Sequence, residues 1–182
     1  MLHEAVERLQ VALSDEFDRA PRICTLATVD AAGDPSARSV VCRRVLAGGE
    51  LYVFSDGRSQ KNAHLRANPA AEVVFWLPRR REQFRLKGPA AIEADPTARG
   101  ACWSELSDAA RAMYAWPPPA AARVAEDAAF PRGLGKDAPV PGTFELLVVR
   151  PRAIEWLDLK PHPHDRRRWR AANDWVEERL NP

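Results

Sequence analysis

The sequence has few of the features that assign a compartment or a partner directly. It contains only three cysteines, Cys24, Cys42 and Cys102, which are far apart and set among apolar residues. This spacing suits neither a disulfide framework nor a zinc site. Basic and acidic residues nearly balance, at 27 and 25, and the net charge is +2. We therefore expect three reduced core thiols, no general affinity for nucleic acid, and only local anion sites.

Long apolar runs are also missing. No stretch reaches the roughly eighteen apolar residues that cross a membrane, and residues 1–9 are charged where a secretory signal would be apolar. These absences predict a cytoplasmic protein without a membrane partner. No internal repeat or domain boundary is visible, so the 182 residues are expected to form a single domain, 1–182.

Helical signals occur in three places. Apolar residues at helical spacing predict an N-terminal helix over residues 1–17, which ends before Pro21. A short helix is expected over 59–66, with Ser59 as its cap and Asn68-Pro69 as its stop. Residues 97–142 combine helical stretches with the triple proline 117–119 and further prolines. They predict a helical and Pro-rich excursion.

Alternating apolar and polar residues predict most of the remaining structure as strands. The expected strands are 23–29, 36–46, 51–54, 71–77 and 83–93, a long run over 143–159, and two short strands around Trp169 and Trp175 within the C-terminal part, 143–182. Short turns connect most of them. The pattern predicts a mainly β fold, an antiparallel meander or barrel with helices packed outside.

Cationic side chains gather at one predicted hairpin. Arg38, Arg43 and Arg44 lie on its first strand, and Arg58 and Lys61 lie at the start of the short helix that follows the second strand. Basic side chains beside a helix N-terminus suit a phosphate group. From the charge pattern alone, solvated surface charge is the simpler interpretation.

Two further segments contain groups that are capable of chemistry. In the strand over 83–93, alternation directs Gln83, Arg85 and Lys87 to one face, where the amide could bind a ligand or simply face solvent. The sequence 162–166 reads His-Pro-His-Asp-Arg. No third metal ligand stands at a suitable spacing, so no metal is predicted. His164 could act as a general acid or base, or the segment could be a surface loop. The arginine triplets 79–81 and 166–168 are interpreted as solvated charge.

The order of these segments resembles the pyridoxamine 5′-phosphate oxidase-like family of FMN-binding split barrels. Residues 38–43 resemble the family's Arg-x-Val-Leu-Leu-Lys strand, 54–55 its Tyr-Thr pair and 59–61 its Ser-Arg-Lys. Gln83 matches the glutamine of its Arg-Gln-Val strand. Residues 164–166 match its His-Asp-Arg, and Trp175 with 179–182 matches its closing Trp-x-x-x-Arg-Leu-x-Pro. The resemblance spans about residues 22–182.

The resemblance implies an antiparallel Greek-key split β-barrel that binds FMN at the interface of a homodimer. Arg38, Arg43, Ser55 and Lys61 would hold the phosphate, and Arg166 would reach in from the partner subunit. Trp156 or Leu157 would contact the flavin, and we prefer Trp156. The full set of implied cofactor-binding residues is Arg38, Ser39, Val40, Val41, Cys42, Arg43, Phe54, Ser55, Ser59, Gln60, Lys61, Gln83, Trp156 and Arg166.

The substrate half of the family's site departs from the pattern. Gln60 replaces an arginine, Arg43 a lysine, and His162 an arginine that covers the pyridoxal ring. The family's Tyr-x-x-x-Arg-x-x-x-Ser clamp for the substrate phosphate has no clear counterpart around 113–119, where only Tyr114 remains. Candidate substrate residues are therefore Arg43, Tyr114, His162 and His164, with His164 as the candidate catalytic group.

The resemblance implies an FMN-dependent oxidoreductase in which hydride passes from a small molecule to flavin N5, with poor activity on pyridoxamine phosphate. Two alternatives stay open. One is an NAD(P)H-dependent reductase of a small molecule, because such barrels need no Gly-rich dinucleotide motif. The other is a flavin-binding or sensing protein without turnover.

Overall fold

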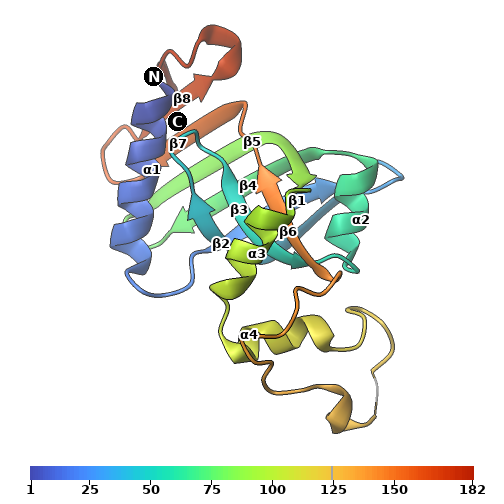
Figure 1. The fold of residues 1–182 in the computed structure, drawn as a ribbon. Coiled ribbons are helices and arrows are strands. Elements are labelled where there is room, and N and C mark those ends of the chain that lie inside the picture. The colour runs from blue at the N-terminus through green and yellow to red at the C-terminus, as the bar shows by residue number, and fades with distance from the viewer. Residues whose placement is uncertain (124) are drawn as a thin grey trace.

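Six antiparallel strands close into a barrel in the computed structural model, which describes residues 1–123 and 125–182. They are β1 (Ile23–Val29), β2 (Pro35–Val45), β3 (Leu51–Asp56), β4 (Ala70–Leu77), β5 (Glu82–Ile92) and β6 (Phe144–Val149). Their order is β4-β1-β2-β3-β6-β5, and pairing of β4 with β5 closes the ring (Figure 1). The order β4-β1-β2-β3 is that of a Greek key. The mainly β barrel is confirmed.

Three more strands continue the sheet beyond the barrel. β7 (Ala153–Asp158), β8 (Asp165–Arg170) and β9 (Glu178–Leu180) follow β5 in order. Residues 82–87 of β5 pair with β7, whereas residues 90–92 pair with β6. The partner changes at Gly88, where a Cβ would lie 2.1 Å from the carbonyl oxygen of Arg150. The chain between β6 and β7 therefore crosses β5 at a point where only glycine fits.

Two expectations for the C-terminal part are corrected. The run over 143–159 is two strands rather than one, because residues 150–152 leave the barrel to start a new edge of the sheet. The last strand is β9, and Trp175 lies before it in a turn with a φ of 59°. Tryptophan promotes a strand by local preference, but here tertiary packing decides.

Two helices pack outside the barrel, as expected (Figure 1). α1 (Leu2–Phe17) buries Ala5, Val6, Leu9, Ala12 and Leu13 completely or nearly so. α2 (Gln60–Ala67) follows β3 and begins one residue later than predicted. Ser59 stands at its N-terminus without a capping hydrogen bond to the helix backbone. Ser59 is therefore the N-cap residue as expected, but its hydroxyl does not cap the helix and is used elsewhere.

The excursion over 97–142 is helical and Pro-rich, as predicted. It contains α3 (Pro96–Ser104), α4 (Asp108–Ala112) and short 3₁₀ turns at Met113–Ala115 and Asp127–Ala129. A third 3₁₀ turn, Ala171–Asn173, precedes β9. In Figure 1, α4 and the following loops project from one end of the barrel. Among the described residues, no helix is long and apolar enough to cross a membrane.

The three cysteines are buried and free, which confirms the expectation of core thiols. Cys24 and Cys42 lie in the barrel core, and Cys102 lies in a second cluster with Trp103 and Phe144. Burial raises the pKa of both Cys24 and Cys42 to about 12. These thiols are therefore protonated and unreactive at neutral pH.

Candidate functional site

Arg38 is fixed near the β1–β2 turn by groups on both strands. It pairs with Leu26 in the register of the hairpin, so its side chain starts on the buried face of β2. Nη1 donates to the carbonyl oxygen of Leu26 at 3.0 Å and to Thr28 Oγ1 at 2.9 Å. Nη2 donates to Ser36 Oγ at 2.6 Å. Burial lowers the pKa of Arg38 from its ordinary value.

Lys61, in the first turn of α2, lies beside Arg38. Its Nζ donates to Ser59 Oγ at 2.9 Å. Burial, followed by the charge of Arg38, lowers the pKa of Lys61, and the more weakly acting Asp56 opposes the shift. A cavity of about 280 Å³ lies between these elements, lined by Ser36, Ala37, Arg38, Ser59, Gln60, Lys61, Pro119 and Ala120.

The two cations of this cavity lack a carboxylate partner. Over residues 1–123 and 125–182, neither Arg38 nor Lys61 takes part in an ion pair, whereas Asp56 is paired with Arg58 at 2.6 Å. Two neighbouring cations at a helix N-terminus repel each other until an anion binds between them. The arrangement can therefore hold a phosphate.

Two serine hydroxyls beside the cavity are held by the buried amide of Asn62. Ser55 Oγ donates to Asn62 Oδ1 at 2.5 Å, and Ser59 Oγ lies 2.9 Å from the same oxygen and 2.7 Å from the carbonyl oxygen of Asp56. Asn62 Nδ2 in turn donates to Glu145 Oε2 at 2.6 Å, which ties α2 to β6. Ser59 thus serves this network rather than the helix backbone.

The other predicted cations are placed differently. Arg43 is exposed, with its guanidinium 5.4 Å from the centre of the Phe54 ring. Arg44 forms an ion pair with Glu105, and Arg58 pairs with Asp56. Of the five cations, only Arg38 and Lys61 line the cavity. On β2, Cys42 is buried and Val40 packs against the core, while Ser39 is exposed.

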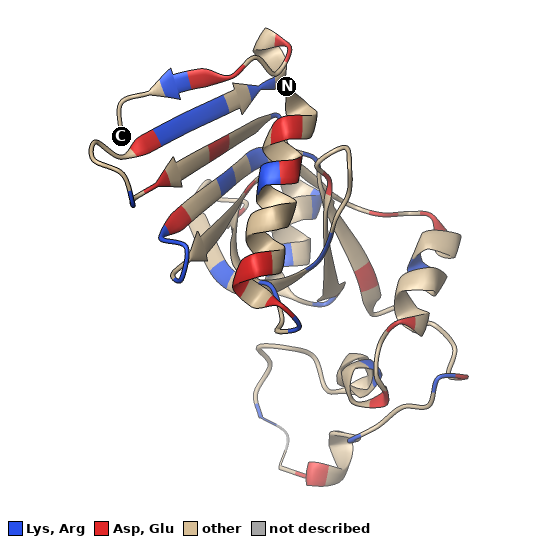
Figure 2. Ribbon diagram, turned by 90° about the vertical axis from the view of Figure 1, so that its left-hand side faces the viewer, with Lys and Arg blue, Asp and Glu red and all other residues tan. Residues whose placement is uncertain are grey.

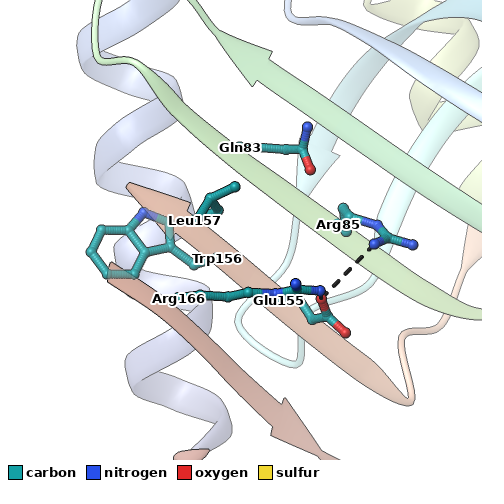
Figure 3. Close-up of a pocket in the computed structure, with 6 residues that line it drawn as sticks. All are labelled: Gln83, Arg85, Glu155, Trp156, Leu157 and Arg166. Atoms are coloured by element: carbon teal, nitrogen blue, oxygen red, sulfur yellow. Dashed lines mark hydrogen bonds and ion pairs between the residues drawn. The ribbon is translucent and has the colours of Figure 1, made fainter. Parts of the chain in front are cut away.

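A second cluster lies on the outer face of the sheet (Figure 3). Gln83 of β5 is directly opposite Leu157 of β7, which is opposite Arg166 of β8. These side chains border a cavity of about 110 Å³, whose lining is Gln83, Arg85, Glu155, Trp156, Leu157 and Arg166. The predicted alternation of Gln83 with the buried Phe84 and Leu86 is confirmed.

The indole of Trp156 points away from this cluster (Figure 3). Its Nε1 donates to Glu82 Oε2 at 3.2 Å, and the guanidinium of Arg8 lies 4.3 Å from the ring centre. Leu157, not Trp156, therefore shares the outer face with Gln83 and Arg166. Both residues border the cavity, so the flavin contact of Trp156 stays a prediction.

Glu82 is a buried carboxylate that accepts several hydrogen bonds. Arg80, Lys160 and Trp156 all donate to it. Burial alone would raise the pKa of Glu82, but these donors hold it below its ordinary value. The network anchors the end of β5 next to Gln83.

Ion pairs occupy much of the outer face of β7 to β9. Figure 2 shows basic residues along β8 and acidic residues on the strands beside it. Arg166 pairs with Glu155, and Arg168 and Arg170 pair with Glu178. Arg167 points to the other face, where it pairs with Asp165. The triplet 166–168 is thus split between two faces, and its members are ion-paired rather than merely solvated, which corrects the sequence-based interpretation.

The candidate substrate residues are dispersed over several elements. Tyr114 is buried, with its ring 5.8 Å from Trp103 and 4.9 Å from Phe144. Burial, only partly offset by the charge of Arg43, raises the pKa of Tyr114 to about 12. His162 and His164 are exposed in the β7–β8 connection, where His164 Nδ1 lies 3.0 Å from the carbonyl oxygen of Pro161.

Four residues at these sites were not singled out from the sequence: Thr28, Asn62, His64 and Glu82. Thr28 is a polar residue on the apolar face of β1, which alternation could have revealed, and Asn62 shares the buried face of helix α2 with Leu65, which helical spacing could have revealed. The role of His64 depends on where α2 lies against β1, which the sequence does not specify.

Comparisons with known proteins show the family of the chain. The model of the family described as "Pyridoxamine 5'-phosphate oxidase, FMN-binding domain" matches residues 3–94. A pyridoxine/pyridoxamine 5′-phosphate oxidase of Cereibacter sphaeroides is 34% identical, with 89% of this chain and 85% of that protein covered. One from Thermosynechococcus vestitus is 30% identical, with coverages of 98% and 89%.

A solved structure is also similar. It is a pyridoxamine 5′-phosphate oxidase-related, FMN-binding protein from Nostoc punctiforme, with a TM-score of 0.81 and 33% identity. The alignment covers 98% of this chain and 94% of that chain.

Proposed function

Because the chain belongs to the pyridoxamine 5′-phosphate oxidase FMN-binding family, we propose that it is an FMN-dependent oxidoreductase acting on a small, unphosphorylated molecule. FMN is the cofactor of the family. Bound FMN supplies a hydride acceptor at N5, and the protein supplies binding, orientation and electrostatics.

The observation that carries the proposal is the pair of uncompensated cations, Arg38 and Lys61. A flavin phosphate between them would form charge-assisted hydrogen bonds and relieve their mutual repulsion. The backbone of the first turn of α2 also lies at this cavity, because Ser59, Gln60 and Lys61 line it. The residues present therefore fit the phosphate end of FMN.

The outer-face cluster supports a shared flavin site in a homodimer. Gln83, Leu157 and Arg166 offer an amide, an apolar side chain and a cation on one surface, suited to the flavin ring of a partner subunit. Beside them Trp76, the strand partner of Gln83, is 47% exposed, as is Ile23 on β1. Burial of these apolar side chains would favour a two-fold interface.

The substrate proposal follows from the surroundings of Tyr114 and Arg111. Tyr114 is packed among aromatic rings, and Arg111, three residues earlier, already donates to the carbonyl oxygens of Leu106 and Leu134 and to Asp108. A substrate phosphate would find neither group available. His164, in the loop after β7, is the candidate for orienting the donor or moving a proton.

Steady-state assays of the FMN-loaded protein test the proposed reaction. We expect a Michaelis constant for pyridoxamine phosphate at least about a hundredfold above that of the Cereibacter sphaeroides oxidase assayed in parallel, since two missing charged hydrogen bonds cost that much. Equal constants would show that other arginines, such as Arg123 or Arg132, form the clamp. Assays with NADH and NADPH test the reductase alternative. Bound flavin without turnover of any donor would indicate a carrier or sensor.

Light scattering and dilution test the homodimer. We expect twice the mass of the chain, and release of FMN when the dimer dissociates on dilution. A monomer that retains tightly bound FMN would contradict a site shared between subunits.

A further inference from the structure

We propose that Thr28 and His64 are positioning residues that hold Arg38 in the orientation required to select FMN over riboflavin. The proposal rests on the proposed function, because it assumes that the cavity beside Arg38 takes the flavin phosphate. A hydrogen-bonded chain of three side chains carries it. Arg38 Nη1 lies 2.9 Å from Thr28 Oγ1, and Thr28 Oγ1 lies 3.1 Å from His64 Nδ1.

The directions of these hydrogen bonds follow from the groups involved. Arginine has no acceptor, so the hydroxyl of Thr28 must accept from Arg38. The hydroxyl proton is then available to His64 Nδ1 at 3.1 Å or to the Ser36 carbonyl oxygen at 3.5 Å. The shorter distance favours His64. The proton of a neutral His64 then resides on Nε2.

Burial makes this chain a fixed feature. Thr28 is 2% exposed and follows Cys24 and Leu26 on the inward face of β1. A hydroxyl at such a position is costly unless it is hydrogen-bonded. Here it bridges the strand that carries Arg38 to helix α2, which also carries Lys61. The chain therefore sets the position of one cation relative to the other.

The chain also determines which part of Arg38 can reach a ligand. Both protons of Nη1 are used, one by the Leu26 carbonyl and one by Thr28, and one proton of Nη2 is used by Ser36. Of the five N–H donors of a guanidinium, the Nε proton and one Nη2 proton remain. These two donors are available for hydrogen bonds to phosphate oxygens.

Loss of the chain should therefore weaken the recognition of phosphate and leave the recognition of the flavin ring unchanged. Without Thr28 Oγ1, one Nη1 proton loses its partner and the guanidinium can rotate away from the cavity. Without His64, Thr28 turns its proton to the Ser36 carbonyl and the link to α2 is lost. Riboflavin has no phosphate, so its affinity reports damage to the rest of the site.

The test measures dissociation constants for FMN and riboflavin, by quenching of flavin fluorescence, in five variants. Thr28→Val and His64→Leu remove the chain. Thr28→Ser restores the hydroxyl, and His64→Asn restores a polar atom near the place of Nδ1. Thr97→Val makes the same threonine change in the first turn of α3, away from the cavity.

We expect Thr28→Val to weaken FMN binding about tenfold, the usual effect of one hydrogen bond to a charged group, with riboflavin affinity changed less than about twofold. His64→Leu should act in the same direction, and Thr28→Ser, His64→Asn and Thr97→Val should stay close to wild type. Because His64 is a half-buried helix residue, His64→Leu keeps the test valid if Thr28→Val fails to fold.

Two outcomes contradict different claims. Unchanged FMN affinity in both Thr28→Val and His64→Leu, or equal weakening of FMN and riboflavin, would overturn the positioning role. A wild-type protein that binds FMN no better than riboflavin would overturn the proposed phosphate site itself.

Discussion

Replacing Glu82 by glutamine should destabilise the fold by about 2 kcal/mol. The carboxylate is buried, with a side chain only 2% exposed. It accepts from Lys160 at 2.8 Å, from Arg80 at 3.0 and 3.2 Å, and from Trp156 at 3.2 Å. A glutamine keeps one acceptor oxygen and turns an NH₂ group toward the cations. Losing hydrogen bonds to charged groups costs about 1.5–3 kcal/mol each, but Lys160 is 48% exposed and can return to water, so we expect the lower part of that range.

Urea denaturation of wild type and Glu82→Gln measures this difference, and Glu105→Gln is the matched control. Glu105 pairs with Arg44 at the surface, where an ion pair is worth about 0–1 kcal/mol. Because the folded-state pKa of Glu82 lies below its unfolded value, its contribution is full at neutral pH and is lost as the pH falls through the folded pKa. The two proteins should therefore converge in acid. A Glu82→Gln protein as stable as wild type at pH 7, or a difference independent of pH, would refute the reasoning.

Two further predictions concern Lys61 and Gly88. Burial and Arg38 lower the pKa of Lys61, so the affinity for FMN should already fall with rising pH below the ordinary lysine pKa of about 10.4. Lys61→Arg should shift this fall to higher pH. If the affinities of wild type for FMN and for riboflavin changed in parallel with pH, the prediction would be contradicted. Gly88→Ala should destabilise the protein by about 1–3 kcal/mol in urea titrations, because the new Cβ meets the Arg150 carbonyl. The control is Gly100→Ala, whose new Cβ would enter open space within α3, and it should be neutral or stabilising. A Gly88→Ala protein as stable as wild type would show that the backbone at the β6–β7 crossing moves to accommodate a Cβ.

Local sequence patterns predicted the barrel strands and both packed helices because each element buries one clear face. Alternation in β5 placed Gln83 and Phe84 on opposite faces correctly. The same reasoning merged β6 with β7 because the apolar pattern continues on both sides of Pro151, although a proline inside a strand pattern signals a break. The place where the chain crosses β5 depends on a close approach to Gly88. Local pattern cannot reveal a contact between distant segments.

The site was predictable only in part for the same reason. Arg38 and Lys61 do line one cavity, as expected, but β3 separates their elements in the chain and Arg38 pairs with Leu26 of β1 rather than with β3. The sequence did not show that Arg44 and Arg58 would pair with carboxylates, which depends on where α3 and the β3–α2 turn lie. Sequence counting preferred Trp156 over Leu157, whereas the strand register decides which side chain faces Gln83.

The most direct test of the central claim is a comparison of FMN and riboflavin binding in wild type, Arg38→Ala, Lys61→Ala and Arg44→Ala. The account predicts tighter binding of FMN by wild type, and a loss of about 1.5–3 kcal/mol of FMN binding in the Arg38 and Lys61 variants without a matching loss for riboflavin. Arg44→Ala, which removes a cation outside the cavity, should bind as wild type does. Equal affinity of the wild-type protein for FMN and riboflavin would contradict the assignment of this cavity to a flavin phosphate.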